Sequence, residues 1–231
     1  AQSALLQSRV CRSALCARWA WSRLKPLLQG EVRAGLVDCT PALESCALDA
    51  ALDALLSRHS TPSRCLGMPG PDEAQLRLLL RAAVQVPDHG RLTPWRFVRI
   101  AGETRARFGQ RLAELASVRG DDAVKVEKER ARYLDAPLVI AVVARILSGH
   151  KIPEQEQLLS AGCACFNLLH AAHALGFGAQ WLTGWPAYDV EVGRWFGLAA
   201  DECIVGFVPI GTAREALPDR ERPDPMSRLS D

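Results

Sequence analysis

Apolar and polar positions follow regular spacings from about residue 50 onward. In 51–60, leucines at positions 52, 55 and 56 share one face, which predicts a short helix. A second helix is expected to begin at Asp72, an N-cap residue whose capping box Gln75 would complete, and to stop before Pro87. Its apolar stripe consists of Leu76, Leu79, Leu80, Ala83 and Val84.

The remaining elements alternate between strands and helices. The β-branched run 137–144 suits a strand covered on both faces, and the small-residue segment 154–175 predicts a long helix closed by Gly176. Further strands are expected over 94–100, 178–184 and 203–211, and further helices around Phe108 to Leu115, over 121–134 and around 189–196. Helices that cover a central sheet predict the α+β class.

Residues 1–50 differ from the rest. The first thirty hold five basic residues, four serines and no acid, a composition found in organelle transit peptides. A translated upstream segment or a poorly ordered tail is the alternative, and we favour it. We therefore expect an N-terminal extension over 1–50 and one domain over 51–231.

The bulk composition narrows the class of protein. The 231 residues are 48% hydrophobic and 23% charged, which is ordinary globular composition. The net charge of +2 gives no reason to expect nucleic acid or an acidic membrane surface, and no apolar run approaches the roughly 20 residues of a membrane span. Eight cysteines contain no C-x-x-C pair, so we expect reduced thiols in a soluble, cytoplasmic protein.

Two stretches could bind a ligand. Arg58, His59 and Ser60 combine a guanidinium with a hydroxyl, which suits a phosphate, although a solvated helix end would have the same composition. His89 lies in a loop stiffened by Pro87 and Pro94, next to Gly90 and a tryptophan. That composition fits a small-molecule pocket or an ordinary polar loop.

Two other patterns carry weaker signals. Cys163, Asn167 and His170 fall near one helical face, with His173 three residues on, but no carboxylate stands at partner spacing, so we do not expect a metal. In 176–184, glycines beside Trp181 could let a flat ring approach the backbone. No G-x-G-x-x-G unit, G-x-S-x-G, H-E-x-x-H or P-loop is present, which disfavours a Rossmann fold.

Five strings in this order resemble the FMN-dependent nitroreductase superfamily, and in particular its small single-domain bacterial NAD(P)H nitroreductases. They are DALLSRHS, LLRAAVQVPDHGRLTPWRF, HKIPEQEQLLSAGCA, ALGFGAQWLTG and IVGFVPIGT. The likeness runs from about residue 51 to 225. It implies a three-layer α+β sandwich with a mixed, mainly antiparallel sheet, and an intertwined homodimer with FMN in each of two interface clefts.

The resemblance also implies site residues. The family's phosphate clamp falls on Arg58, His59 and Ser60, and flavin contacts lent by the other subunit fall on Gln85 and His89. A segment that lines the flavin falls on Trp181, Leu182 and Thr183. The stretch assigned to the nicotinamide cofactor falls on Ala171, Ala172, His173, Ala174, Leu175 and Gly176.

Three cationic positions of the family are replaced, by His59, Gln85 and Leu182. We expect a weaker hold on phosphate or reduced flavin unless a nearby arginine compensates: Arg64, Arg91, Arg220 or Arg222. The implied activity is ping-pong reduction of nitroaromatic, quinone or similar acceptors by NADH or NADPH through FMN, with no catalytic side chain. Alternatives are other redox chemistry on the same fold, such as dehalogenation, desaturation or flavin breakdown, or a weakly active flavin-binding protein.

Overall fold

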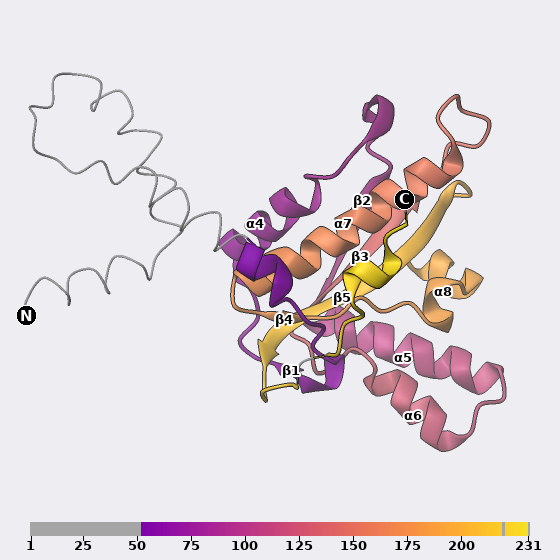
Figure 1. Cartoon of the computed structure of the whole chain (residues 1–231). Coiled ribbons are helices and arrows are strands. Elements are labelled where there is room, and N and C mark those ends of the chain that lie inside the picture. Colours follow the sequence, from indigo (N-terminus) through magenta and orange to yellow (C-terminus); the bar gives the residue numbers. More distant parts are fainter. Residues whose placement is uncertain (1–51, 219, 231) are drawn as a thin grey trace, which may run out of the picture. The chain divides into compact units, whose positions relative to one another are not determined.

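The computed structural model describes residues 52–218 and 220–230; the extension over 1–50, with its expected disorder, lies outside them. Residues 52–56 are helical, as the leucine spacing predicts. The following helices are α4 (Glu73–Ala83), α5 (Glu103–Val118), α6 (Ala123–Ala131), α7 (Glu154–Ala174) and α8 (Val190–Trp195). The strands are β1 (Leu66–Gly67), β2 (Trp95–Ala101), β3 (Leu138–Arg145), β4 (Gly178–Ala179) and β5 (Glu202–Ala213) (Figure 1).

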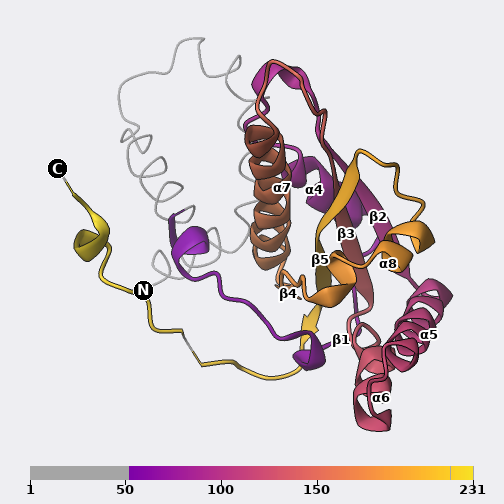
Figure 2. The same cartoon turned by 90° about the vertical axis from the view of Figure 1, so that its right-hand side faces the viewer.

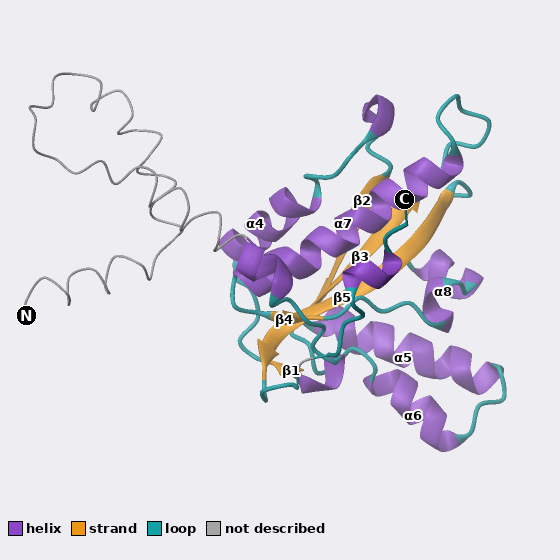
Figure 3. Ribbon diagram, viewed as in Figure 1, coloured by secondary structure: helices purple, strands orange, loops and turns teal. Residues whose placement is uncertain are grey.

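The strands form one sheet in the order β1-β5-β3-β2, with β4 also paired to β5. Every pairing between these strands is antiparallel. Strand β3 lies at the centre, and seven of its eight residues are buried, which confirms the prediction from its β-branched run. The α+β class is also confirmed, with helices on both faces of the sheet (Figure 3).

Alternation along β3 divides the core into two layers. Leu138, Ile140 and Val142 face α4 and α7, while Val139 and Ala141 face the side covered by α5 and α8. Figure 2 shows α4 and α7 on one side of the strands and α5 and α8 on the other. On the second side, an aromatic group forms the centre of the packing: Phe108, Tyr133, Trp195, Phe196 and Phe207.

The helix ends follow the local rules. Asp72 and Gln75 form the predicted capping box of α4, with the Gln75 N–H 2.7 Å from the Asp72 carboxylate. At the end of α7, Gly176 has φ 81°, its N–H donates to the His173 carbonyl, and the next N–H reaches the Ala172 carbonyl. This pair of hydrogen bonds is the Schellman arrangement, which requires a left-handed residue that glycine adopts without strain.

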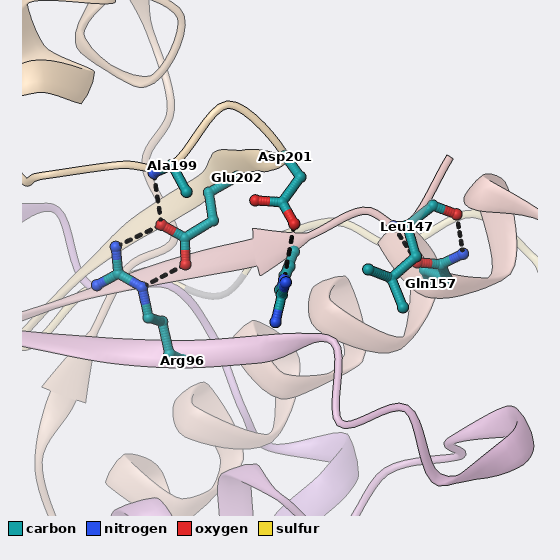
Figure 4. Close-up of polar contacts among 7 residues, drawn as sticks. Arg96, Leu147, Gln157, Ala199, Asp201 and Glu202 are labelled. Carbon is teal, nitrogen blue, oxygen red and sulfur yellow. Dashed lines mark hydrogen bonds and ion pairs between the residues drawn. The ribbon is translucent and has the colours of Figure 1, made fainter. Parts of the chain in front are cut away.

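Ion pairs join the strands at one end of the sheet (Figure 4). The Arg96 guanidinium of β2 donates from Nε and Nη2 to the two carboxylate oxygens of Glu202 at 2.6 and 2.8 Å, across the end of β3. The Ala199 N–H also donates to this carboxylate, at 3.0 Å. These hydrogen bonds, those from Arg96 foremost, lower the pKa of Glu202 to about 2.

The strand expected over 178–184 is the main difference from the prediction. Only Gly178 and Ala179 form β4, and Leu182 then makes an isolated bridge to Phe207. Backbone pairing with β5 nevertheless continues past Ala179, because the Gln180 N–H donates to the Pro209 carbonyl at 3.3 Å and Leu182 exchanges hydrogen bonds with Phe207. The Trp181 indole adds a side-chain contact with the strand, since its Nε1 donates to the Val205 carbonyl at 3.2 Å.

Candidate functional site

Basic side chains from three parts of the chain gather at the C-terminal end of α7. Arg58 and His59 precede β1, His170 and His173 lie in the last turns of α7, and Arg222 belongs to the C-terminal segment. We call these five residues the basic cluster. The Ser57 hydroxyl lies 3.0 Å from His173 Nε2, and the rings of His59 and His173 meet edge to face with centroids 6.3 Å apart.

The segment that carries Arg58, His59 and Ser60 is held against the sheet. The Thr61 N–H donates to the Ala179 carbonyl of β4 at 2.9 Å, and Gly178 leaves room for the Thr61 side chain. Arg58 is half-buried and Ser60 is exposed, so the hydroxyl predicted to bind phosphate is open to solvent. The Arg222 guanidinium donates to the Arg58 carbonyl at 3.4 Å, so Arg222 is a neighbour of the clamp among the arginines named above.

The charges that act within the basic cluster are of one sign. Burial, followed by the charge of Arg222, lowers the pKa of Arg58. Burial and the charges of Arg58 and His173 lower the pKa of His170, and burial and the charges of His59 and Arg58 lower that of His173. Within the described part of the chain, every charge that shifts these pKa values is positive.

Two polar atoms of the basic cluster are buried without a hydrogen-bond partner among the described residues, Arg58 Nη1 and His170 Nε2. A buried donor that lacks a partner costs about 1–3 kcal/mol, and more when it is charged. An anion placed against these atoms would remove that cost and relieve the repulsion within the basic cluster. The cluster therefore has the donor set and charge of an anion-binding site.

The loop that carries His89 packs on the opposite end of α7 (Figure 2). His89 Nδ1 lies 2.7 Å from the Glu156 carboxylate, while the His89 side chain remains 66% exposed. The Ser160 hydroxyl donates to the Pro87 carbonyl at 2.6 Å. Gly90 has φ 70°, a left-handed conformation that glycine adopts without strain, and a Cβ there would press on the end of the Ile152 side chain.

Gln85 is exposed at the end of α4, and its backbone is anchored from α7. Asn167 donates to the carbonyls of Ala82 and Gln85 at 3.0 and 2.9 Å. Helical spacing groups Asn167 with possible metal ligands, but its amide donates to the end of α4 instead. No group of three or more possible metal ligands occurs among residues 52–218 and 220–230.

Trp181, Leu182 and Thr183 lie along β5. Gly206 of β5 leaves the space that the Trp181 indole fills, and a Cβ there would lie 2.5 Å from the indole Cδ1. Leu182 exchanges backbone hydrogen bonds with Phe207 at 2.9 and 2.8 Å. Gly162 of α7 also faces the indole, so Trp181 lies between α7 and β5 with 37% of its surface exposed.

One chain brings only some of the predicted site residues together. His173, predicted in the nicotinamide stretch 171–176, joins the predicted phosphate clamp, while the rest of that stretch forms the last turn of α7 and its cap. His89 contacts Glu156, seventeen residues before His173 along α7, which corresponds to about 25 Å at 1.5 Å per residue. The loop and the clamp of one chain are therefore far apart.

The sequence patterns do not assign His170 to the clamp. Its spacing of three from His173 indicates at most a metal site. The place where segment 57–60 meets α7 depends on tertiary packing, which helical spacing cannot show.

The model of the Nitroreductase family matches residues 55–212. The chain belongs to the nitroreductase family. Proteins of this family are oxidoreductases, and the chain is an enzyme of that class.

Individual relatives agree with this assignment. The Escherichia coli K12 protein named "Putative NAD(P)H nitroreductase YdjA" is 40% identical over 176 residues, covering 76% of this chain and 95% of that protein. A nitroreductase-like family protein from Bacillus cereus has a TM-score of 0.65 at 20% identity, over 78% of this chain and 94% of the other. A nitroreductase with bound FMN from Bacteroides fragilis has a TM-score of 0.59 at 20% identity, over 75% and 94%. The two structures show the shared nitroreductase fold.

Proposed function

We propose that this nitroreductase-family enzyme binds FMN and uses NADH or NADPH to reduce electron-poor acceptors such as nitroaromatics and quinones. The observation that supports this most directly is the unpartnered Arg58 Nη1 within the basic cluster, at the position where the family places its phosphate clamp. The names of the Escherichia coli relative and of the FMN-bound Bacteroides fragilis structure point the same way.

The residues present fit the phosphate end of FMN. Arg58 offers a buried donor, Ser60 an exposed hydroxyl, and His59 an imidazole beside them. Charge-assisted hydrogen bonds to phosphate are about twice as strong as neutral ones, so Arg58 is the principal anchor. When bound, FMN supplies the two-electron chemistry, taking hydride from the nicotinamide donor and passing the electrons to the acceptor.

Trp181, Leu182 and Thr183 are proposed to line the ring end of the flavin. The hydrogen bonds of Leu182 with Phe207 hold this segment on β5, and Trp181 presents an exposed aromatic edge. These residues position the ring and exclude water, while the last turn of α7, from Ala171 to Gly176, is proposed to contact the nicotinamide donor.

Gln85 and His89 are proposed to reach the flavin of a second copy of the chain. The separation of about 25 Å between the His89 loop and the clamp exceeds the length of one FMN, so one chain cannot close the site from both ends. An apolar stripe on α7 supports a homodimer: Leu159, Cys163 and Phe166 are spaced by four and three residues and are all exposed.

A cytoplasmic location is also proposed. The four cysteines within the described residues are free thiols, and two of them, Cys163 and Cys203, are exposed, which suits a reducing compartment. No helix in that part of the chain has both the length and the apolar character of a membrane span.

The test begins with the purified protein, which should be yellow with an absorbance band near about 450 nm from the flavin. Apoprotein should bind FMN, and Arg58→Ala should weaken that binding far more than Arg77→Ala, which removes an exposed arginine of α4. NADH or NADPH should bleach the band, and a quinone should restore it. A protein that binds flavin but is bleached by neither nicotinamide would support the weakly active flavin-binding alternative, and a protein without flavin affinity would refute the proposal.

A further inference from the structure

Three histidines belong to the same cluster as Arg58, whose buried Nη1 has no hydrogen-bond partner among the described residues. The groups that face one another are Arg58 and His59 on the segment before β1, His170 and His173 on α7, and Arg222 on the C-terminal segment. No carboxylate of the described residues contributes to the charge acting on Arg58, His170 or His173. The charge of this site therefore depends on how many of its imidazoles are protonated.

The surroundings of His170 and His173 disfavour protonation of their imidazoles. His170 and His173 are partly buried beside a permanent positive charge, and both effects favour the neutral ring. A bound phosphate has the opposite effect, because an imidazolium beside it gains a charge-assisted hydrogen bond. Phosphate binding and proton binding should then strengthen each other, since coupling between two ligands is reciprocal.

We propose that His170 and His173 are phosphate-binding residues that take up protons when the FMN phosphate binds, so that this enzyme holds its flavin more tightly below neutral pH than above it. The inference rests on the proposed function for the identity of the ligand. It also supplies cations where His59 replaces an arginine of the family clamp. His170 offers a buried Nε2 without a partner, and His173 Nε2 lies within hydrogen-bond distance of Ser57 beside the clamp.

The position of His173 could instead serve the nicotinamide donor alone, as the resemblance to the family implies. The two roles predict different ligand dependences. A nicotinamide role would change the interaction with NADH or NADPH and leave flavin affinity unaffected. A phosphate role would change the affinity for FMN and leave that for riboflavin, which lacks the phosphate, nearly unchanged.

The experiment measures the dissociation constants of FMN and riboflavin for the apoprotein by quenching of flavin fluorescence, in phosphate-free buffers between about pH 5.5 and 8.5, a range that spans the histidine pKa. In the wild type, the preference for FMN over riboflavin should fall as the pH rises, by about tenfold for each unit by which FMN binding raises the pKa of a histidine. His170→Gln and His173→Gln should each flatten this dependence, and His173→Arg should keep high affinity without it. His150→Asn is the matched control, because His150 is exposed on the loop before α7.

The phosphate of FMN itself titrates near about pH 6. On the acidic side of the profile, its change of charge would overlap with that of the histidines. Sulfate keeps its charge over the whole range, so its competition with FMN should weaken steadily as the pH rises. Calorimetry of the wild type in two buffers with different ionisation enthalpies counts the protons directly and requires no variant. We expect net proton uptake on FMN binding near neutral pH and none on riboflavin binding.

The outcomes separate the two proposals. If flavin fails to bind at every pH while sulfate stabilises the protein more at low pH, the proposed function fails and the proton-coupled anion site stands. If FMN binds without proton uptake, or if the glutamine variants retain the wild-type pH profile, the inference is overturned while the proposed function survives.

Discussion

Replacing Glu202 with glutamine is expected to remove a pH-dependent contribution to stability. The carboxylate accepts two hydrogen bonds from Arg96 and one from the Ala199 N–H, and its pKa falls to about 2. Glutamine retains the size of the side chain and loses the charge. The pair joins β2 to β5 across the end of β3, so its loss should weaken the sheet (Figure 4).

The magnitude follows from the two pKa values. Against about 4.3 for an ordinary glutamate, a pKa near 2 corresponds to about 3 kcal/mol of stabilisation at neutral pH. Glu202 is 11% exposed but Arg96 is 40% exposed, so water screens the pair and about 1–2 kcal/mol is a better expectation. Because the folded-state pKa is the lower one, this contribution is present above about pH 4.3 and is lost as the pH falls towards 2.

Urea unfolding of the apoprotein at pH 7 and pH 3 provides the measurement. At pH 7, Glu202→Gln should be about 1–2 kcal/mol less stable than the wild type, and at pH 3 the difference should shrink by more than half. Arg96→Gln and the double variant complete a cycle that isolates the coupling between the two side chains. A difference between the wild type and Glu202→Gln that stays the same at both pH values would refute the reasoning.

Three further substitutions test other parts of the structure. Gly206→Ala should displace the Trp181 indole, which lowers stability by about 1–3 kcal/mol in thermal unfolding and weakens riboflavin binding; unchanged riboflavin affinity would contradict the placement of Trp181 at the ring. Asn167→Ala should cost about 1–2 kcal/mol, because two carbonyls at the end of α4 lose their donor, and hydrogen exchange should rise there and in the His89 loop rather than elsewhere. Tyr133→Phe should leave stability unchanged or raise it by up to about 1 kcal/mol, since the buried hydroxyl has no partner among the described residues; a clear loss in urea unfolding would mean that the hydroxyl is bonded in solution.

Much of the fold could be predicted because local rules decide it. Asp72 and Gln75 indicate the start of α4, and Gly176 indicates the end of α7. Each forms hydrogen bonds with backbone groups of its helix end that lie only a few residues away. The β-branched composition of β3 by itself indicates that the strand is buried. In these places, residues near in sequence determine the structure.

The site was less predictable because it depends on contacts between distant segments. The strand expected over 178–184 shortens to Gly178–Ala179, and no local pattern indicates that Gly206 of β5 leaves space for the Trp181 indole. His173 meets Ser57 across 116 positions of sequence. Such a contact becomes visible only when the packing of both segments is known.

The length of α7 has a consequence for how this protein can change. One end of the helix holds the His89 loop through Glu156, and the other carries His170 and His173. Inserting a single residue between them would turn one end by about 100° relative to the other and move it by about 1.5 Å. Length variation should therefore be tolerated near Gly149 in the loop before α7, where an added Cβ would meet no atom within 4 Å, and rejected within the helix. In engineering, the number of residues in α7 should therefore be kept constant.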